Sequence, residues 1–327
     1  MSLFQKLGKQ FFACILFVFS TVSFSQSLRN YTLANGLPGN SIKALYKDSK
    51  GIMWIATETG LCTYDGLEFE VVNHEDGLKY NLVWNIIEDK ENNIWLSLYG
   101  NGIAKFDGDK FTYYNKKNGL VNDAVRTLYY SEENETLVLG TEDGLSVFDG
   151  NTFRNFSFSN SILPRKSQVN FISQYNGKIL FSVSKGGIYE LKIDKKEISN
   201  STIDFFCNLN TINFSGFING NNYYSLNSKN QFEINNLRTR EKTTREKTTH
   251  IWDFAVDNSG VVYGASWGVN NTEGGLYSYS KGELKKINTQ YNITSNQIWC
   301  LYYDEQSEQL WVGSVDQGIF VIDLSKK

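Results

Sequence analysis

Seven positions, recurring roughly every 40 residues along the chain, carry side chains that could bind a small ligand. Each follows the apolar residue that opens a short apolar run, so we expect all seven to face the same way. Flat indole faces together with amide and guanidinium donors suit a sugar, in particular an acidic one. We add Trp267, which opens a long loop expected beside them. The seven positions hold three indoles, two cations and two amides, with no carboxylate: Lys43, Trp84, Arg126, Asn170, Asn213, Trp252 and Trp299.

The same tryptophans can also be interpreted as core residues, and the sequence leaves both interpretations open. Four loop residues are expected at the same end of the fold, namely Glu58, Tyr99, Glu142 and Lys185. Residues 267–274 form the longest of these loops. Because repeat proteins often place binding residues in insertions confined to one face, this end is the predicted ligand-binding surface.

The chain offers few residues for catalysis or metal binding. Its two histidines, His74 and His250, are expected nearly opposite each other in the fold. The cysteines that follow the N-terminal leader are an odd and sparse set, which is not a disulfide framework, and no pair has metal-ligand spacing. We therefore predict no catalytic residue, no metal and no cofactor. The three cysteines are interpreted as small buried apolar side chains: Cys62, Cys207 and Cys300.

Composition and charge narrow the fold class and the partners. The 327 residues are 41% hydrophobic, which is enough to bury a large core. Two prolines, 27 glycines and 19 tyrosines favour many short strands joined by tight turns over helices. The formal net charge is −3, so no basic excess is present to contact phosphates, and we predict no nucleic-acid partner.

Residues 1–25 resemble a secretory signal peptide. Lys6 and Lys9 precede an uncharged apolar run from Phe11 to Phe19, and the small residues Ser23 and Ser25 suit cleavage before residue 26. The alternative is a membrane anchor, for which the run is short, and we expect no lipidation or later membrane span. The sequence therefore predicts export to the periplasm or the extracellular space.

An internal repeat decides the fold class. Gly36, Gly77 and Gly119 open three closely similar segments that are 41 and 42 residues apart, the period of one β-propeller blade. Weaker copies follow, with a tandem charged pentapeptide at residues 240–249 that we expect to form a solvated loop or an extended hairpin. We predict an all-β, seven-bladed propeller over residues 26–327, with blades at 35–72, 76–114, 118–156, 168–200, 211–238, 250–287 and 296–324.

Each part of the repeat has an expected structural role. Short apolar runs form the first two strands, and an Asp-Gly pair such as Asp65-Gly66 makes the hairpin turn between the third and fourth. Trp54 and Trp95 recur at blade period on second strands, so we expect their rings between neighbouring blades.

The last copy lacks a fourth strand, and the N-terminus supplies a match. Leu28 lies seven residues before Asn35, the same offset that separates Phe69 from Asp76. We therefore expect residues 28–33 to form the outer strand of blade seven, which closes the ring and hides an otherwise unpaired edge.

The repeat resembles that of the two-component regulator propeller family. The resemblance is carried by Asn-Gly-Leu-Pro at residues 35–38, Asp-Ser-x-Gly-x-x-Trp-Ile-x-Thr at 48–57, Gly-Leu at 60–61, Tyr-Asp-Gly at 64–66 and Phe69. Such propellers usually form the periplasmic sensory region of hybrid histidine kinases, and many respond to polysaccharide breakdown products. The resemblance thus implies a non-catalytic sensory module, with an oligosaccharide or other small ligand and a membrane sensor kinase or other protein as partners. No kinase histidine motif or nucleotide-binding loop is present in the sequence, so we expect no phosphotransfer by this chain itself.

Two other function classes remain open at this point. One is a secreted scaffold or adhesin that binds protein, in which case binding would ignore oligosaccharides. The other is an enzyme, because propellers host lyases and glycosidases and the fold alone does not exclude them. A release assay on streptogramins and common glycans would separate the enzyme from the binding modules.

Overall fold

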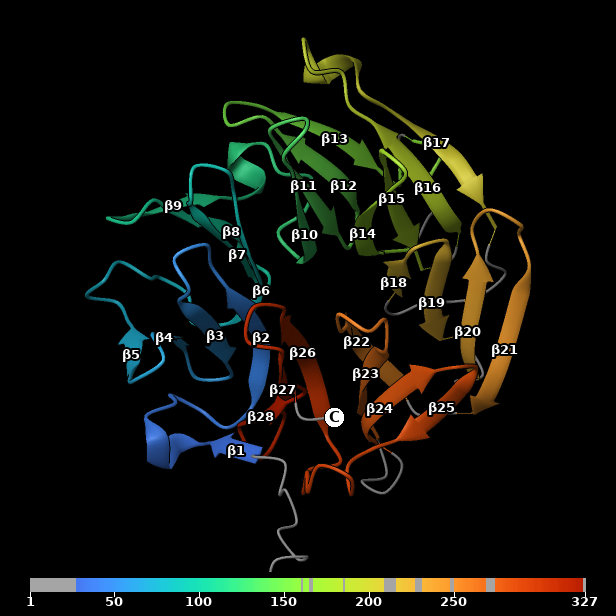
Figure 1. Ribbon diagram of the computed structural model, residues 1–327. Helices are drawn as coiled ribbons and strands as arrows, with labels where there is room; N and C mark the ends of the chain where they lie inside the picture. The colour runs from blue at the N-terminus through green and yellow to red at the C-terminus, as the bar shows by residue number, and fades with distance from the viewer. Residues whose placement is uncertain are drawn as a thin grey trace, which may run out of the picture.

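Short strands with apolar inner positions fold into seven antiparallel sheets of four strands each, arranged around a common centre (Figure 1). The computed structural model describes residues 28–159, 161–164, 167–184, 186–208, 216–226, 231–247, 250–268 and 274–325, without the side chains of 245–247. The expected signal peptide and Asn213 lie outside these residues. The structure confirms the predicted fold class, an all-β, seven-bladed propeller.

The first three blades follow the close sequence repeats. Blade one holds β2 (Ile42–Lys47), β3 (Met53–Thr57), β4 (Leu61–Tyr64) and β5 (Phe69–Val72). Blade two holds β6 (Val83–Glu88), β7 (Ile94–Leu98), β8 (Gly102–Phe106) and β9 (Phe111–Tyr114). Blade three holds β10 (Val125–Ser131), β11 (Thr136–Thr141), β12 (Gly144–Phe148) and β13 (Phe153–Ser157).

The weaker repeats also form complete blades. Blade four holds β14 (Val169–Tyr175), β15 (Lys178–Val183), β16 (Gly187–Lys192) and β17 (Thr202–Cys207). Blade five holds β18 (Gly216–Asn219), β19 (Asn222–Leu226), β20 (Gln231–Asn236) and β21 (Lys242–Lys247). Blade six holds β22 (His250–Val256), β23 (Val262–Trp267), β24 (Gly275–Ser280) and β25 (Glu283–Lys286), and blade seven holds β26 (Ile298–Asp304), β27 (Gln309–Ser314), β28 (Ile319–Asp323) and β1 (Leu28–Tyr31).

Two outer strands extend beyond the expected blade limits. In blade four, the connection after β16 contains a 3-10 turn at Ile198–Asn200, so the outer strand β17 begins only at Thr202, past the expected limit at residue 200. In blade five, the charged pentapeptide supplies β21, which pairs antiparallel with β20, so the extended hairpin is the expected alternative that the structure shows. An outermost strand pairs on one side only and is largely solvated, so it lacks the apolar pattern by which inner strands are recognised.

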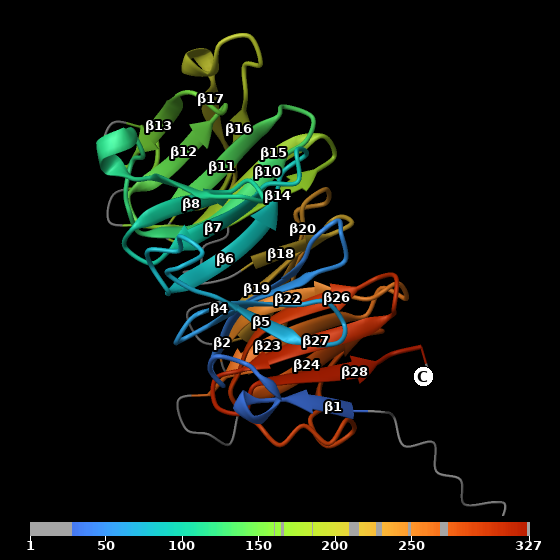
Figure 2. The ribbon, with the colours of Figure 1, turned by 90° about the vertical axis from the view of Figure 1, so that its left-hand side faces the viewer.

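The ring closes with strands from both ends of the chain, as predicted. β1 pairs antiparallel with β28, with Leu28 opposite Ile322 and Tyr31 opposite Ile319. Figure 2 shows the two strands side by side, blue against red. The strand ends at Tyr31, two residues earlier than expected, because Thr32 caps a 3-10 turn over Leu33–Asn35.

Aromatic side chains on the second strands fill the space between blades. Trp54 and Trp95 are 7% and 4% exposed and pack against Phe106 and Phe148 of the next blade, which confirms their predicted place.

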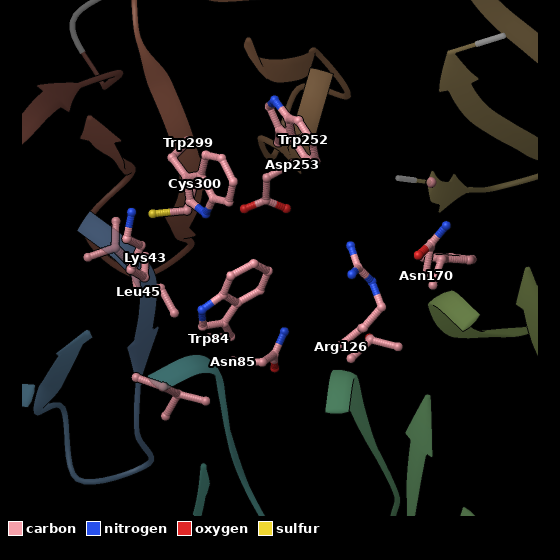
Figure 3. Close-up of a pocket in the computed structure, with 15 residues that line it drawn as sticks. Lys43, Leu45, Trp84, Asn85, Arg126, Asn170, Trp252, Asp253, Trp299 and Cys300 are labelled. Carbon is pink, nitrogen blue, oxygen red and sulfur yellow. The ribbon is translucent and has the colours of Figure 1, made fainter. Parts of the chain in front are cut away.

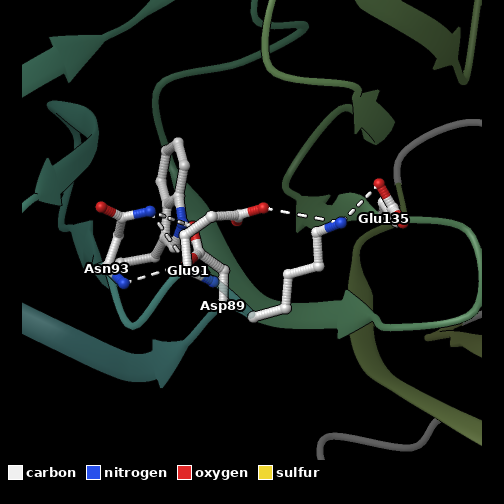
Figure 4. A network of polar contacts seen from close by, with 6 residues as sticks. Asp89, Glu91, Asn93 and Glu135 are labelled. Atoms are coloured by element: carbon white, nitrogen blue, oxygen red, sulfur yellow. Dashed lines mark hydrogen bonds and ion pairs between the residues drawn. The ribbon is translucent and has the colours of Figure 1, made fainter.

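An aspartate at the end of the first strand holds each of these rings. Trp95 donates its indole N–H to Asp89 at 2.7 Å, and the backbone N–H groups of Glu91 and Asn93 donate to the same carboxylate. Figure 4 shows this network, in which Lys90 also reaches Glu135 of blade three at 2.6 Å. In blade one, Asp48 accepts the equivalent hydrogen bond from the indole N–H of Trp54, so the same arrangement holds both rings.

We expect Asp89→Asn to lower the free energy of unfolding by about 1–3 kcal/mol. The amide cannot accept from all of the donors that face it, so a buried indole or backbone N–H loses its partner. Urea unfolding measures the change. Asp109→Asn is the matched control, because Asp109 is an exposed turn residue for which less than about 0.5 kcal/mol is expected. Equal urea midpoints for Asp89→Asn and the unmodified protein would contradict the role assigned to Asp89.

Candidate functional site at one mouth of the central channel

A β-bulge marks the predicted ligand-facing position in six innermost strands. The pairing register shifts between Ile42 and Ala44, and likewise between Val83 and Asn85. In both strands the residue left out of the pairing, Lys43 or Trp84, is the one predicted to face the ligand. A β-bulge can turn such a side chain in a new direction. The same shift occurs around the four remaining described positions, Arg126, Asn170, Trp252 and Trp299.

The re-aimed side chains line one cavity of about 240 Å³ (Figure 3). The apolar residue before each of them is buried between blades, with Ile42 and Val83 at 0% exposure. The fold thus brings together six of the eight predicted site residues as cavity lining: Lys43, Trp84, Arg126, Asn170, Trp252 and Trp299.

Indole rings form a continuous wall on one side of this cavity. Trp252 and Trp299 are stacked with ring centroids 5.0 Å apart, and Trp84 meets Trp299 edge-on at 6.2 Å. Trp267 contacts the rings of Trp299 and Trp252 at 5.8 and 6.2 Å without itself being a lining residue. The wall therefore offers stacking faces and is itself held by neighbouring rings.

Cationic and amide groups complete the lining. The ammonium of Lys43 donates to the Ser41 hydroxyl at 2.9 Å and lies 5.2 Å from the Trp299 ring centroid, a cation–π contact. Arg126 and Asn170 lie on the other side of the cavity from Lys43 and Trp299 (Figure 3). The arrangement places hydrogen-bond donors across from aromatic faces.

Two of the four loop residues expected at this mouth contact lining residues, and a third, Glu58, contacts the strand entry beside them. Tyr99 stacks on Trp84 with centroids 4.6 Å apart. Glu142 accepts from Arg126 at 3.1 Å, and Glu58 accepts from the backbone N–H of Ser41 at 2.7 Å. Lys185 and residues 269–273 of the long loop lie outside the described residues.

The cavity contains a carboxylate, Asp253, that the repeat pattern of the sequence does not predict. Asp253 lines it and accepts the backbone N–H groups of Phe254 at 2.8 Å and of Leu301, in the next blade, at 2.9 Å. Burial raises the pKa of Asp253 to about 6. The predicted positions hold no carboxylate, but a bulge turns two consecutive residues toward one side, and Asp253 follows Trp252. Cys300 lies at the equivalent place after Trp299, and burial raises the pKa of its thiol well above the usual value.

We expect the Asp253 carboxyl to make folding stability fall as pH rises through about 6. Because the folded-state pKa lies above the unfolded value of about 4, the folded protein binds this proton more tightly, and its contribution is present at low pH and lost above pH 6. The full effect is about 2–3 kcal/mol. Other carboxyls with lowered pKa, such as Asp304, act in the opposite direction.

The difference between the unmodified protein and Asp253→Asn isolates this effect. Urea unfolding between pH 4.5 and 7.5 should show the variant gaining stability relative to the unmodified protein as pH rises. The exposed Asp109→Asn control should show no such trend. A stability difference that is independent of pH would contradict the raised pKa.

The histidines and metal-ligand candidates bear on the enzyme alternative. His250 opens β22 and its ring lies 6.0 Å from the Trp252 ring centroid, so one histidine is beside the aromatic wall. His74 lies in the turn before blade two, where its carbonyl accepts from Gly77. Within the described ranges, no group of three or more His, Cys, Asp and Glu side chains could hold a metal ion.

The fold and this cavity define a β-propeller whose channel mouth is lined by aromatic and donor side chains. Residues 36–59 match the model of the two component regulator propeller family, within the first repeat, so the resemblance noted from the sequence is confirmed. No helix in the described part of the chain has the length and apolar character needed to cross a bilayer.

The chain is similar to parts of longer proteins. Over 88 residues, the chain is 28% identical to histidine kinase P4 of Formosa agariphila, an alignment that covers 24% of this chain and 6% of the kinase. The extracellular domain of a hybrid two component system from B. thetaiotaomicron has a TM-score of 0.72 at 17% identity, covering 90% of this chain and 41% of that one. The chain thus spans less than half the length of these relatives.

A propeller enzyme is also similar in fold. A catalytically inactive histidine-to-alanine variant of virginiamycin B lyase from Staphylococcus aureus, solved with quinupristin, has a TM-score of 0.69 at 12% identity. The similarity covers 91% of this chain and 99% of the lyase. At these identities the likeness extends to the fold alone.

Proposed function

We propose that this chain is a non-catalytic, exported sensory propeller that binds a small saccharide at the channel mouth and relays binding to a membrane kinase partner. The observation that carries the proposal is the cavity itself, where an indole wall faces Arg126 and Asn170. A sugar presents an apolar face that stacks on indoles and hydroxyls that accept from guanidinium and amide groups. The matched repeat and the similar fold of an extracellular domain from a hybrid two component system support an exported, signalling role.

The size of the cavity limits what it can enclose. Its volume of about 240 Å³ is below the roughly 300–1,000 Å³ of typical ligand pockets, so we infer that one or two sugar rings enter it. A longer saccharide would extend out of the cavity across blade two, where Leu82 and Tyr99 are 44% and 47% exposed beside Trp84.

The same exposed surface favours protein binding as the second candidate function. Tyr80 is 40% exposed and packs edge-on against Tyr113, and the carbonyl of Leu82, two residues further on, accepts from the backbone N–H of Tyr99. Exposed apolar patches of this kind often mark protein interaction sites. A scaffold or adhesin would use this surface and would not need the cavity.

A glycan array probed with residues 26–327 tests the proposal directly. We expect retention of short saccharides, with acidic ones preferred, and no release of product from streptogramins or glycans. Binding of proteins with no saccharide retained would favour the scaffold, and turnover of a streptogramin would favour the lyase. Either result would overturn the sensory assignment.

A further inference from the structure

The guanidinium of Arg126 is held by a contact that a ligand can replace. Its Nη1 donates to Glu142 Oε1 at 3.1 Å, a single bond from a group with five N–H donors. The two side chains are 20% and 44% exposed. Exposed ion pairs of this kind are weak, because solvent screens them and both side chains lose freedom.

The backbone that carries Glu142 is fixed independently of that contact. The N–H of Glu142 donates to the carbonyl of Ala124 at 3.1 Å, and the preceding Thr141 hydroxyl donates to the carbonyl of Gly144 at 2.9 Å. The Glu142 side chain can therefore leave Arg126 while the turn keeps its place.

The corresponding glutamate of blade one does not contact the cavity cation. Glu58 accepts from the backbone N–H of Ser41, and Lys43 donates to the Ser41 hydroxyl instead of to Glu58. Among the described residues, Lys43 forms no ion pair, and Asp253 is held by two backbone N–H groups. Of the two cations that line the cavity, Arg126 is thus the one that forms an ion pair within the described residues, with Glu142.

We propose that Arg126 reads an anionic group of the ligand, a carboxylate or sulfate, and that Glu142 is the resident competitor which this group displaces. The inference rests on the proposed saccharide cavity and adds what selects the ligand. A neutral sugar can accept hydrogen bonds from the guanidinium N–H groups that Glu142 leaves free, but it gains no charge interaction with Arg126. An anionic sugar exchanges one carboxylate for another and frees Glu142 into solvent.

Anionic and neutral quenchers of tryptophan fluorescence test this competition without a known ligand. Iodide is the anionic probe and acrylamide the neutral one, and both report on the indoles of the cavity wall. We expect Glu142→Gln to raise the iodide quenching constant about two- to fivefold while the acrylamide constant stays unchanged. In the double variant Arg126→Gln/Glu142→Gln, the iodide quenching constant should return to that of the unmodified protein.

Glu58→Gln is the matched control, because Glu58 occupies the same place in blade one and its amide replacement can still accept from Ser41. It should leave both quenching constants unchanged. The inference is overturned if Glu142→Gln changes the iodide constant by less than about 1.3-fold, or changes the acrylamide constant equally.

Saccharide probes separate this inference from the proposed function. D-Glucuronate and D-glucose 6-sulfate should protect the indoles from iodide more strongly in Glu142→Gln than in the unmodified protein, and D-glucose should protect both equally. Equal protection by all three sugars in every variant would overturn the anion subsite and leave the saccharide cavity standing. If inorganic sulfate protects and no sugar does, the proposed saccharide function fails while the competition between Glu142 and a free anion stands.

Discussion

A chain that begins at residue 35, without the strand that closes the ring, should lose on the order of 3–6 kcal/mol of stability and aggregate. The deletion removes the whole of β1 and exposes the edge of β28. It also removes Tyr31, whose ring packs 5.3 Å from Phe69 and 6.1 Å from Trp311, and whose hydroxyl lies 3.1 Å from that of Tyr64. Urea unfolding of the chains that begin at residues 26 and 35 measures the loss.

Point variants separate the contribution of the β1 side chains to the free energy of unfolding from that of the backbone pairing between β1 and β28. Tyr31→Ala should cost about 1–3 kcal/mol, because it opens a cavity among three aromatic rings. Arg29→Ala, on the exposed side of the same strand, should cost less than about 0.5 kcal/mol. If the chain that begins at residue 35 unfolds at the same urea concentration as the longer chain, the ring does not depend on β1 for closure.

The fold could be predicted because its inner strands repeat an apolar pattern at the period of one propeller blade. The positions of Trp54 and Trp95 followed from their recurrence at blade period. The outer strands could not be placed as well. Lys242–Lys247 carries no apolar side chain, and it is held by backbone pairing with β20, which leaves no trace in residue type.

Individual residues of the candidate site could be predicted from the sequence, but the complete lining of the cavity and its contacts could not. Alternation along a strand places Trp84 and Arg126 opposite the buried Val83 and Val125. It does not reveal that a bulge turns the next residue inward as well, which is why Asp253 was missed. Contacts such as Arg126 with Glu142 join a strand to a turn 16 residues away, and no periodicity encodes them.

Alanine substitutions at the cavity should separate its binding role from a packing role. For a saccharide retained on the glycan array, Trp84→Ala, Trp252→Ala and Arg126→Ala should each weaken affinity by at least about tenfold, or about 1.4 kcal/mol. A stacked sugar loses an aromatic face in the first two variants, and an anionic group loses its donor in the third. Isothermal titration calorimetry measures the affinity, and urea unfolding checks that each variant folds.

Arg154→Ala is the matched control in the same blade as Arg126. Arg154 lies on the outer strand β13 and its guanidinium packs 4.9 Å from the Phe156 ring centroid, away from the cavity lining. Its loss should leave affinity unchanged. If all three cavity variants bind within about threefold of the unmodified protein, a difference under about 0.7 kcal/mol, their side chains are packing residues. The ligand would then bind elsewhere, and the exposed surface formed by Tyr80, Leu82 and Tyr99 on blade two would be the next to test.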